Sequence, residues 1–580
     1  MRKRTGLVLA LALVAATVVA YLPALSAGFV WNDDTYLTDN PTLDGAHGLR
    51  LIWTDTKANE QYYPAVFTSF WLEKRVWGVH PLGYHLANVL LHAGSALLLW
   101  WLLRRLALPG GWLAGALFAL HPVCVESVAW VTERKNTLSM LLTLLAAHAF
   151  LAAMDARAAA HGRGKRRGAP LPPWHRRSAA LYPAALALFT LALLAKTTAS
   201  VLPAVLLVLA WWRHGRVRAS EVRPLLPFFA IGAALALHTA WLERTLVEAK
   251  GSEWSLDLAG RVVLAGRVLA FYGWKLVWPA NLAFIYPRWT IDVRSLLQWM
   301  PAVAALAALG AAWALRRAIG RGPLAGLLLV GGVVFPAMGF FNVYAMRYSY
   351  VADHFAYQAV AVAAACAACS GAALGGRAAA PARRAAVALT MVVLAALAAL
   401  SFRQCRAYAS ADTLWRDTLA KNPDCFMCHT NFGHWLAANG RVADAVDHLE
   451  TALRLKPDNA LALLNLARIE EQRGNTEEAV ARYRAALAID PANTVALVNL
   501  GTLYAKTRRS EDAIAAYRQA LGNPSPDDYL AHNGMGVALM QLGRVGEAVE
   551  EFREAVRLRP DYGMARANLE RALVMSAGAR

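Results

Sequence analysis

Long apolar runs recur along residues 1–402 and stop there, although the chain continues to residue 580. A helix needs about 20 predominantly apolar residues to cross a bilayer, where every backbone N–H and C=O must be paired within the protein. Hydrophobic residues make up 57% of the chain, more than is usual for a soluble domain. The sequence therefore predicts an all-α fold, with a polytopic membrane domain at 1–402 and a soluble helical domain at 403–580.

Basic residues cluster in the short segments between the apolar runs. The clusters lie at 104–105, 157–177, 213–223, 316–321 and 377–384. Short basic loops mark the cytoplasmic side of a membrane protein. Placing them all there predicts about eleven spans, a cytoplasmic N-terminus and an extracytoplasmic C-terminal domain. This topology accounts for the net charge of +20, and no basic patch with interleaved aromatic residues predicts nucleic-acid binding.

The stretch at 243–296 does not follow this simple pattern. Arg261, Arg267 and Lys275 interrupt its apolar part. If it crossed the membrane, the basic residues at 316–321 would fall outside, against the charge rule. We interpret 243–296 as an external loop that contains a re-entrant or interfacial amphipathic segment.

The first apolar run, at 7–25, follows a basic N-terminus. It is interpreted as an uncleaved signal anchor, and a secretory signal ending near residue 27 is the alternative. Under both interpretations Asp33 and Asp34 lie outside the cytoplasm, next to the membrane. Two adjacent carboxylates resist ionising together, which raises one pKa toward the range of a general base. The alternative is that the pair is the solvated start of a loop.

Further polar residues gather at the external ends of later spans. Glu126 is a candidate second acid or metal ligand, although one acid with one histidine is weak support for a metal, and no metal site is predicted. Cationic side chains at these turns are candidates for binding a lipid phosphate. They are Arg134, Lys135, Lys196, Arg347 and His354. The alternative is that they anchor the spans at the membrane interface, together with nearby aromatic residues.

The C-terminal domain has a repeat of 34 or 35 residues. The recurring residues are Pro423, Pro457, Pro491, Pro526 and Pro560, with Asn431, Asn465, Asn499 and Asn533. Two helices per unit, with small residues where they cross and a proline at the junction, are typical of tetratricopeptide repeats. Four repeats are predicted, preceded by the second helix of a partial repeat at 411–423. Such arrays usually bind a peptide or protein segment on their concave face.

Cys425, Cys428 and His429 match the pattern of c-type haem attachment. They lie at the start of a repeat helix, at positions that pack against the preceding helix, and no apolar pocket is evident around them. A disulfide or a packing role is therefore favoured over haem attachment.

Several short motifs stand together in residues 29–140. They are Trp31-Asn32-Asp33-Asp34, Asp39-Asn40-Pro41, Tyr63-Pro64, the stretch from Gly83 to His92, and His121-Pro122-Val123 followed by Glu126, Trp130 and Arg134-Lys135-Asn136. In these motifs, and in the order of membrane domain and repeats, the chain resembles the transmembrane and tetratricopeptide-repeat-containing O-mannosyltransferases and their bacterial relatives.

That resemblance implies the C-type glycosyltransferase (GT-C) superfamily, with about eleven membrane helices and a polyprenyl-phosphate-linked sugar as donor. Asp33 and Asp34 correspond to the position of the catalytic acid in the first external loop, and Glu126 to the acid of the second. Which aspartate is the base, and whether a divalent metal takes part, stay open. The Ala- and Arg-rich sequence indicates a high-GC bacterium. The implied location is thus the inner membrane, with the repeats in the periplasm or outside.

The predicted function is transfer of a sugar, such as mannose, from a polyprenyl-phosphate donor to a protein or other acceptor outside the cytoplasm. The repeats would bind the acceptor or a partner protein. No nucleotide-binding motif is present in the sequence, which fits a lipid-linked donor. The alternatives are a non-catalytic membrane-anchored scaffold, a transporter of lipid-linked material and a haem-bearing redox protein.

Overall fold

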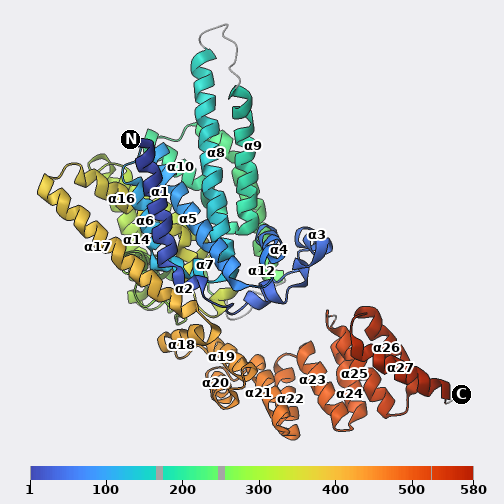
Figure 1. Cartoon of the computed structure of the whole chain (residues 1–580). Helices are drawn as coiled ribbons and strands as arrows, with labels where there is room; N and C mark the ends of the chain where they lie inside the picture. The colour runs from blue at the N-terminus through green and yellow to red at the C-terminus, as the bar shows by residue number, and fades with distance from the viewer. Residues whose placement is uncertain (1, 165–173, 246–254, 524, 579–580) are drawn as a thin grey trace. The chain divides into compact units, whose positions relative to one another are not determined.

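The computed structural model describes residues 2–164, 174–245, 255–523 and 525–578 (Figure 1). All regular structure in these residues is helical. The chain divides into two compact units, Met1–Asn422 and Pro423–Arg580. The change in composition after residue 402 falls one helix earlier than this division, because α18 (Ala411–Lys421) packs within the first unit. The basic segment at 157–177 and the loop at 243–296 lie partly outside the described residues.

Six helical segments in the described residues are long and apolar enough to cross a membrane. They are Pro81–Arg105, Val131–Ala159, Ala219–Thr245, Leu296–Arg317, Asp353–Gly375 and Ala380–Tyr408. A seventh is added if Gly111–Leu120 and Pro122–Ala129, which meet at a bend of 56°, count as one broken span. These helices make the chain a membrane protein.

The predicted number of about eleven spans is not confirmed. In the part of the chain searched, the other apolar runs form apolar helical stretches of 10–17 residues, namely Arg4–Ala20, Ala180–Ala195 and Gly322–Ala337, while α10 (Leu202–His214) has 13 residues. Hydropathy measures the length of an apolar run, whereas turns and prolines determine where its helix ends. At 120–122, for example, the helix breaks before Pro122, which cannot donate a helical backbone hydrogen bond.

The core of the first unit is formed by α5 (Pro81–Arg105) and α8 (Arg134–Gly164). Half of the apolar window of α5 is buried, compared with 11% of that of α14 (Leu296–Ala314), so α5 lies inside and α14 faces outward. The helix α6 (Gly111–Leu120) packs against α5, and α8 lies side by side with α9 (Trp174–Ala195) in Figure 1. Outward apolar side chains are expected where lipid is the solvent.

Polar side chains on the inner face of α5 connect it to other segments. The ring of His85 lies 3.3 Å from the carbonyl oxygen of Gly28, and that of His92 lies 2.7 Å from the hydroxyl of Tyr357. Both rings are fully buried, and each has a ring nitrogen within hydrogen-bond distance of a partner on another segment. These residues of the motif from Gly83 to His92 therefore position the segments around them.

The segment between α1 (Arg2–Ala20) and α5 contains η1 (Asp34–Thr38), η2 (Pro41–Leu43), α3 (Gly45–Thr54) and α4 (Pro64–Trp77). Asn40 caps η2, because its side-chain oxygen accepts from Thr42 N at 2.9 Å and its amide nitrogen donates to Asn59 at 2.8 Å. Pro64 is the first residue of α4, where its missing N–H has no helical partner to lose. The motifs at 39–41 and 63–64 thus fix the path of this loop.

The ambiguous stretch contains α13 (Leu258–Val277), which is not among the candidate spans in the described residues. Val263, Val268 and Tyr272 are buried along one face, whereas Leu258 and Val277 are more than 70% exposed. An amphipathic helix with large exposed apolar residues is typical of a membrane interface. The placement of α13 in that interface stays a prediction.

The second unit consists of four helical hairpins and a final helix. The helices are α19 (Phe426–Ala438), α20 (Val442–Leu455), α21 (Ala460–Arg473), α22 (Thr476–Ile489), α23 (Thr494–Lys506), α24 (Ser510–Leu521), α25 (Asp528–Gln541), α26 (Val545–Leu558) and α27 (Gly563–Gly578). Small residues lie where paired helices cross: a Cβ on Gly433 would meet Leu449, and one on Gly536 would meet Phe552. This arrangement is the one that the 34-residue period predicts.

Candidate functional site

Asp33 is buried, and both oxygens of its carboxyl group accept hydrogen bonds. One oxygen accepts from Val30 N at 2.9 Å, and the other from the N–H (2.8 Å) and hydroxyl (2.7 Å) of Thr132. Burial raises the pKa of Asp33 to about 7, while the three donated hydrogen bonds oppose that rise. The hydrogen bonds of Asp33 therefore hold the loop after α1 against η4 (Val131–Glu133), and Thr132 stands 99 positions after Asp33 in the chain.

Asp34 is exposed, in contrast with its neighbour. One of its carboxylate oxygens accepts from Thr35 N at 2.8 Å at the start of η1. A change from a buried to an exposed side chain between adjacent residues follows from the short helical turn that begins here. The two carboxylates predicted as a pair thus have different environments, one enclosed and one open to an approaching molecule.

Trp31, two residues before Asp33, has an unusual backbone conformation and a closely packed ring. Its φ angle is 27°, which is rare for a residue with a large side chain and is maintained only when the surroundings enforce it. The ring stacks on Trp130 at 5.5 Å between centroids and meets Phe284 and Trp415 edge-on at 5.3 and 6.2 Å. Aromatic packing from three other segments therefore determines where the Asp33–Asp34 turn lies.

Arg134 and Lys135 are adjacent but lie in different environments. Arg134 is 1% exposed, and its guanidinium group donates to the carboxylate of Glu73, to Asn88 and to the carbonyl of Tyr84. These contacts join α4, α5 and α8. They use the planar guanidinium group of Arg134, which provides several hydrogen-bond donors in fixed directions.

The side chains of Lys135 and Lys196 converge on Glu133, and we name these three residues the lysine–glutamate cluster. Each lysine Nζ lies 3.1 Å from one carboxylate oxygen of Glu133. The lysine side chains are 10% and 11% exposed, so solvent screens their charge weakly. Two ammonium groups on one carboxylate leave a net charge of +1, and Asn136 donates a further hydrogen bond to Glu133 at 2.8 Å.

Glu126 pairs with His354. Its two carboxylate oxygens contact the ring Nδ1 and accept from the backbone N–H of His354, both at 2.9 Å. Asn136 donates to the carbonyl oxygen of His354 at 2.9 Å, which joins this pair to the lysine–glutamate cluster. The hydroxyl of Tyr286 donates to the neighbouring carboxyl group of Asp353 at 2.8 Å.

The structure thus brings four of the eight predicted site residues into one polar region. Lys135, Lys196, Glu126 and His354 join through Glu133 and Asn136. Arg347 lies in η10 (Tyr344–Arg347), with its guanidinium group 5.9 Å from the ring centroid of Tyr348. The roles of all these residues in donor binding or catalysis stay predictions.

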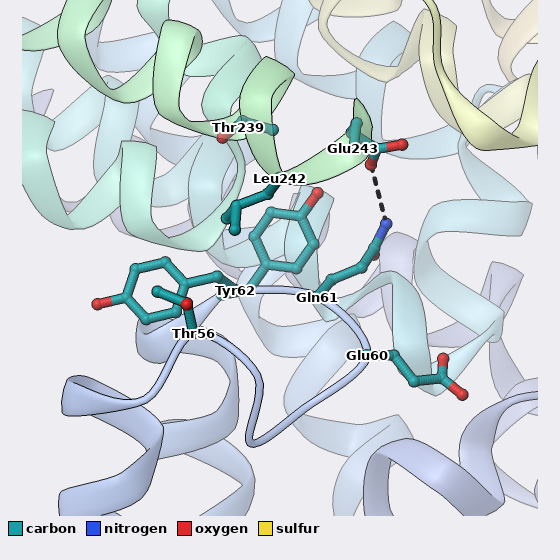
Figure 2. A pocket seen from close by; sticks show the side chains of 8 residues that line it. Thr56, Glu60, Gln61, Tyr62, Thr239, Leu242 and Glu243 are labelled. Carbon is teal, nitrogen blue, oxygen red and sulfur yellow. Dashed lines mark hydrogen bonds between the residues drawn. The ribbon is translucent and has the colours of Figure 1, made fainter. Parts of the chain in front are cut away.

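Sequence reasoning missed Glu133 and two further polar residues, Gln61 and Glu243. Gln61 Nε2 donates to Glu243 Oε1 at 3.3 Å, and Glu243 Oε2 accepts from Tyr344 N at 3.2 Å. A hollow that is partly open to solvent lies around these two residues, as Figure 2 shows. Glu243 is a carboxylate at the end of an apolar run, which was a usable signal, whereas nothing in the sequence marks Gln61.

Cys425 and Cys428 form a disulfide at the N-terminal end of α19. The ring of His429 lies 2.8 Å from that of His448 and 3.0 Å from the carbonyl of Pro423. In the described residues, no three His, Cys, Asp or Glu side chains are grouped so that they could hold a metal ion. Haem attachment and metal binding are not tested by this geometry.

Family models confirm the repeats. Two models, both described as tetratricopeptide repeat, match residues 430–494 and 498–563 in one case and 471–523 in the other. Together with the apolar helices, they define the chain as a membrane protein with a tetratricopeptide-repeat unit.

The chain is also similar in sequence to several protein O-mannosyl-transferases. The chain is 37% identical over 140 residues to protein O-mannosyl-transferase Tmtc1 of Drosophila melanogaster, over 22% of this chain and 16% of that one. It is 28% identical over 150 residues to protein O-mannosyl-transferase F38B6.6 of Caenorhabditis elegans, over 23% and 22%. With human protein O-mannosyl-transferase TMTC1 it shares 25% identity over 514 residues, or 79% of this chain and 56% of that one.

These relatives confirm the resemblance to the transmembrane and tetratricopeptide-repeat-containing O-mannosyltransferases. The chain matches less than two thirds of the length of each of the three. The bacterial origin stays a prediction.

Proposed function

We propose that this chain transfers a hexose from a polyprenyl-phosphate donor to a hydroxyl group of a protein acceptor. The observation that supports it most is the convergence of an exposed carboxylate and a buried cationic cluster on one loop. Glu60 interacts electrostatically with both Lys135 and Asp34, so the three side chains belong to the same region of the fold. Burial raises the pKa of Glu60, while Lys135 and a hydrogen bond from Thr35 lower it.

Asp34 is the better candidate for the general base. A base must lie within hydrogen-bond reach of the proton that it accepts, so geometry decides before pKa does. Asp33 has a pKa in the working range, but its oxygens are enclosed and accept three hydrogen bonds. Asp34 is open to an acceptor hydroxyl. Asp33 then acts as a positioning residue that keeps the turn in place.

The lysine–glutamate cluster is the better candidate for binding the donor phosphate. Its net positive charge lies in a poorly solvated region, where the attraction of an anion is stronger than in water. The indole Nε1 of Trp130 is also buried, without a hydrogen-bond partner in the described residues, and its ring lies 5.9 Å from Lys135 Nζ. Arg134 is fully engaged with protein groups and serves to hold α4, α5 and α8 together.

The proposed reaction moves one proton and one glycosyl group. The acceptor oxygen attacks the anomeric carbon, and the bond between that carbon and the phosphate oxygen breaks with its electron pair going to the phosphate. Asp34 takes the hydroxyl proton, and the released polyprenyl phosphate stays next to Lys135 and Lys196. Fixed cations that face the developing charge of a leaving group lower the barrier to its departure.

The repeats supply a binding surface for the acceptor or for a partner protein. Stacked tetratricopeptide repeats bind peptide segments on a continuous concave face. We place the reaction at the extracytoplasmic side of a bacterial inner membrane, because the basic loops then lie in the cytoplasm. No cofactor is required by the proposed step, and a divalent metal enters it only if activity responds to chelation.

The donor class is tested with the purified full-length chain in proteoliposomes. Radiolabelled polyprenyl-phosphate mannose and the nucleotide donor GDP-mannose are offered in parallel, with a serine- and threonine-rich peptide as acceptor. Transfer from the lipid-linked donor alone, and its loss in Lys196→Met, is expected. Transfer from GDP-mannose alone would contradict the proposal. Peptide capture by the repeats without transfer from either donor would favour a membrane-anchored scaffold.

A further inference from the structure

The hollow beside the proposed catalytic loop has a lining of mixed chemistry. The side chains around it are Thr56, Glu60, Gln61, Tyr62, Tyr63, Thr239, Leu242 and Glu243. They come from two segments, the loop before α4 and the last turns of α12 (Leu226–Thr245), as Figure 2 shows. We propose that this hollow is the subsite for the sugar ring of the donor, with Gln61 and Glu243 as its hydrogen-bonding pair; this inference rests on the proposed function.

Two hydrogen bonds connect the hollow to the catalytic loop. The hydroxyl of Tyr36, which lies in η1 two residues after Asp34, donates to Gln61 Oε1 at 2.8 Å. The amide nitrogen of Gln61 then donates to Glu243 at 3.3 Å, drawn as the dashed line in Figure 2. A ligand in the hollow therefore lies next to the loop that bears the proposed base.

The lysine–glutamate cluster borders the same hollow from another direction. Lys135 Nζ lies 5.2 Å from the ring centroid of Tyr36 and 5.7 Å from that of Tyr63. Tyr63 is one of the residues that line the hollow. A phosphate held by Lys135 thus lies near Tyr63, a residue that lines the hollow, so a sugar attached to that phosphate has the hollow within reach.

The lining suits a neutral polyol better than an anion or a lipid tail. Two carboxylates, Glu60 and Glu243, would repel a phosphate in the hollow, so the phosphate is directed to the lysines instead. Carboxylate and amide groups accept and donate several hydrogen bonds at once, as vicinal hydroxyls require. Leu242 is the one aliphatic hydrophobic side chain of the lining, and the remaining apolar surface comes mainly from the rings of Tyr62 and Tyr63.

Aromatic side chains complete the hollow. Tyr62 donates from its hydroxyl to the carbonyl of Trp53 at 3.1 Å, and its ring meets that of His238 edge-on at 6.0 Å. A ring held at both its edge and its hydroxyl offers a fixed apolar surface at low entropic cost. The C–H face of a hexose packs on such a surface while its hydroxyls reach the polar side chains.

The test compares two ligands that differ only in the sugar. Affinities of polyprenyl-phosphate mannose and of sugar-free polyprenyl phosphate are measured for the full-length chain in detergent micelles. Loss of a buried hydrogen bond should weaken binding of the mannosyl lipid about tenfold in Glu243→Gln and in Gln61→Ala. Binding of the sugar-free lipid should change less than about twofold in both, which also shows that the variants are folded.

Two further variants separate the sugar subsite from the phosphate site. Lys135→Met should weaken both ligands about equally, by about tenfold. Asp44→Asn, on the exposed side of the same loop, should change neither. Equal loss of both ligands in Glu243→Gln, or equal wild-type affinity for both, would overturn the sugar subsite alone. Wild-type binding of neither lipid would overturn the proposed function and, with it, the subsite.

Discussion

In the first unit, Arg134 is 1% exposed and pairs with Glu73, which stands 61 positions earlier in the chain. In the second unit, Arg553 pairs with Glu550 on the surface, three residues apart on the same helix. The first pair joins separate helices and fixes their arrangement. The second pair lies on the exposed face of a helix that packs against its neighbours through apolar and small residues. Charge therefore determines structure where it is buried and has little effect where water surrounds it.

The same contrast explains how the site is built. In the first unit the charged contacts of Asp33, Lys196 and Glu126 reach residues 99, 63 and 228 positions away. In the repeats the described ion pairs are mostly three or four residues apart. Long-range polar contacts give a precisely placed site, and short-range ones give a soluble array that neighbouring repeats extend.

The largest expected effect comes from breaking the two arginine pairs in parallel. Arg134→Met leaves Glu73 without its partner and should destabilise the first unit by about 3–5 kcal/mol. Arg553→Met, which removes an exposed pair, should leave the melting of the second unit unchanged within error. Thermal unfolding in detergent, with one reporter in each unit, measures both. Equal shifts in the two variants would remove the distinction between the units.

The next effect is a pH dependence that belongs to Asp33. Its pKa is about 7 in the folded protein, raised by burial above the ordinary value of 3.8. At Asp33 the folded state therefore binds more protons than the unfolded state between these pH values, so the contribution of Asp33 to stability is fully present below pH 4 and is lost as pH rises toward 7. The slope is at most about 1.4 kcal/mol per pH unit.

The matched variant for this prediction is Asp33→Asn, which removes the titrating group. The difference in melting temperature between wild type and Asp33→Asn should change steadily from pH 4 to pH 7 and level off above it. A difference that is constant over this range would show that Asp33 keeps an ordinary pKa.

A smaller effect is expected from two glycines of the repeats. A Cβ added at Gly536 would lie 2.6 Å from a ring atom of Phe552. Gly536→Val should therefore destabilise the second unit by about 1–3 kcal/mol through overpacking. A Cβ on Gly546, in α26, meets nothing within 4 Å. Gly546→Ala should therefore stabilise the helix, by about 0.5–1 kcal/mol. Denaturant unfolding monitored in the second unit distinguishes the two, and shifts in the same direction would contradict the packing described.

The sequence predicted the repeats well because their information is local. Prolines and asparagines at a fixed period, with small residues at helix crossings, define each hairpin without reference to the rest of the chain. The spans were predicted less well, since an apolar run such as the one around Pro122 contains a break that hydropathy does not register. The bend of 56° there follows from a proline and a turn within the run.

The site was predicted in its members but not in its arrangement. The sequence assigned the same role to both residues of each adjacent pair, Asp33 with Asp34 and Arg134 with Lys135. In each pair, however, the first residue is buried and forms its hydrogen bonds with other protein groups. Which one is engaged depends on partners such as Thr132 and Glu73, and no local pattern identifies them. Gln61 and Glu243 meet across 182 positions, which only the fold reveals.

The most direct test of the proposed chemistry compares turnover in Asp34→Asn and Asp33→Asn, with polyprenyl-phosphate mannose as donor and a peptide as acceptor. Loss of a general base should lower kcat of Asp34→Asn by about 10²–10⁴-fold while donor affinity is retained. Asp33→Asn should keep measurable turnover in proportion to its folded fraction. Full activity in Asp34→Asn, with activity abolished in a folded Asp33→Asn, would contradict the assignment and make the buried carboxyl group the base.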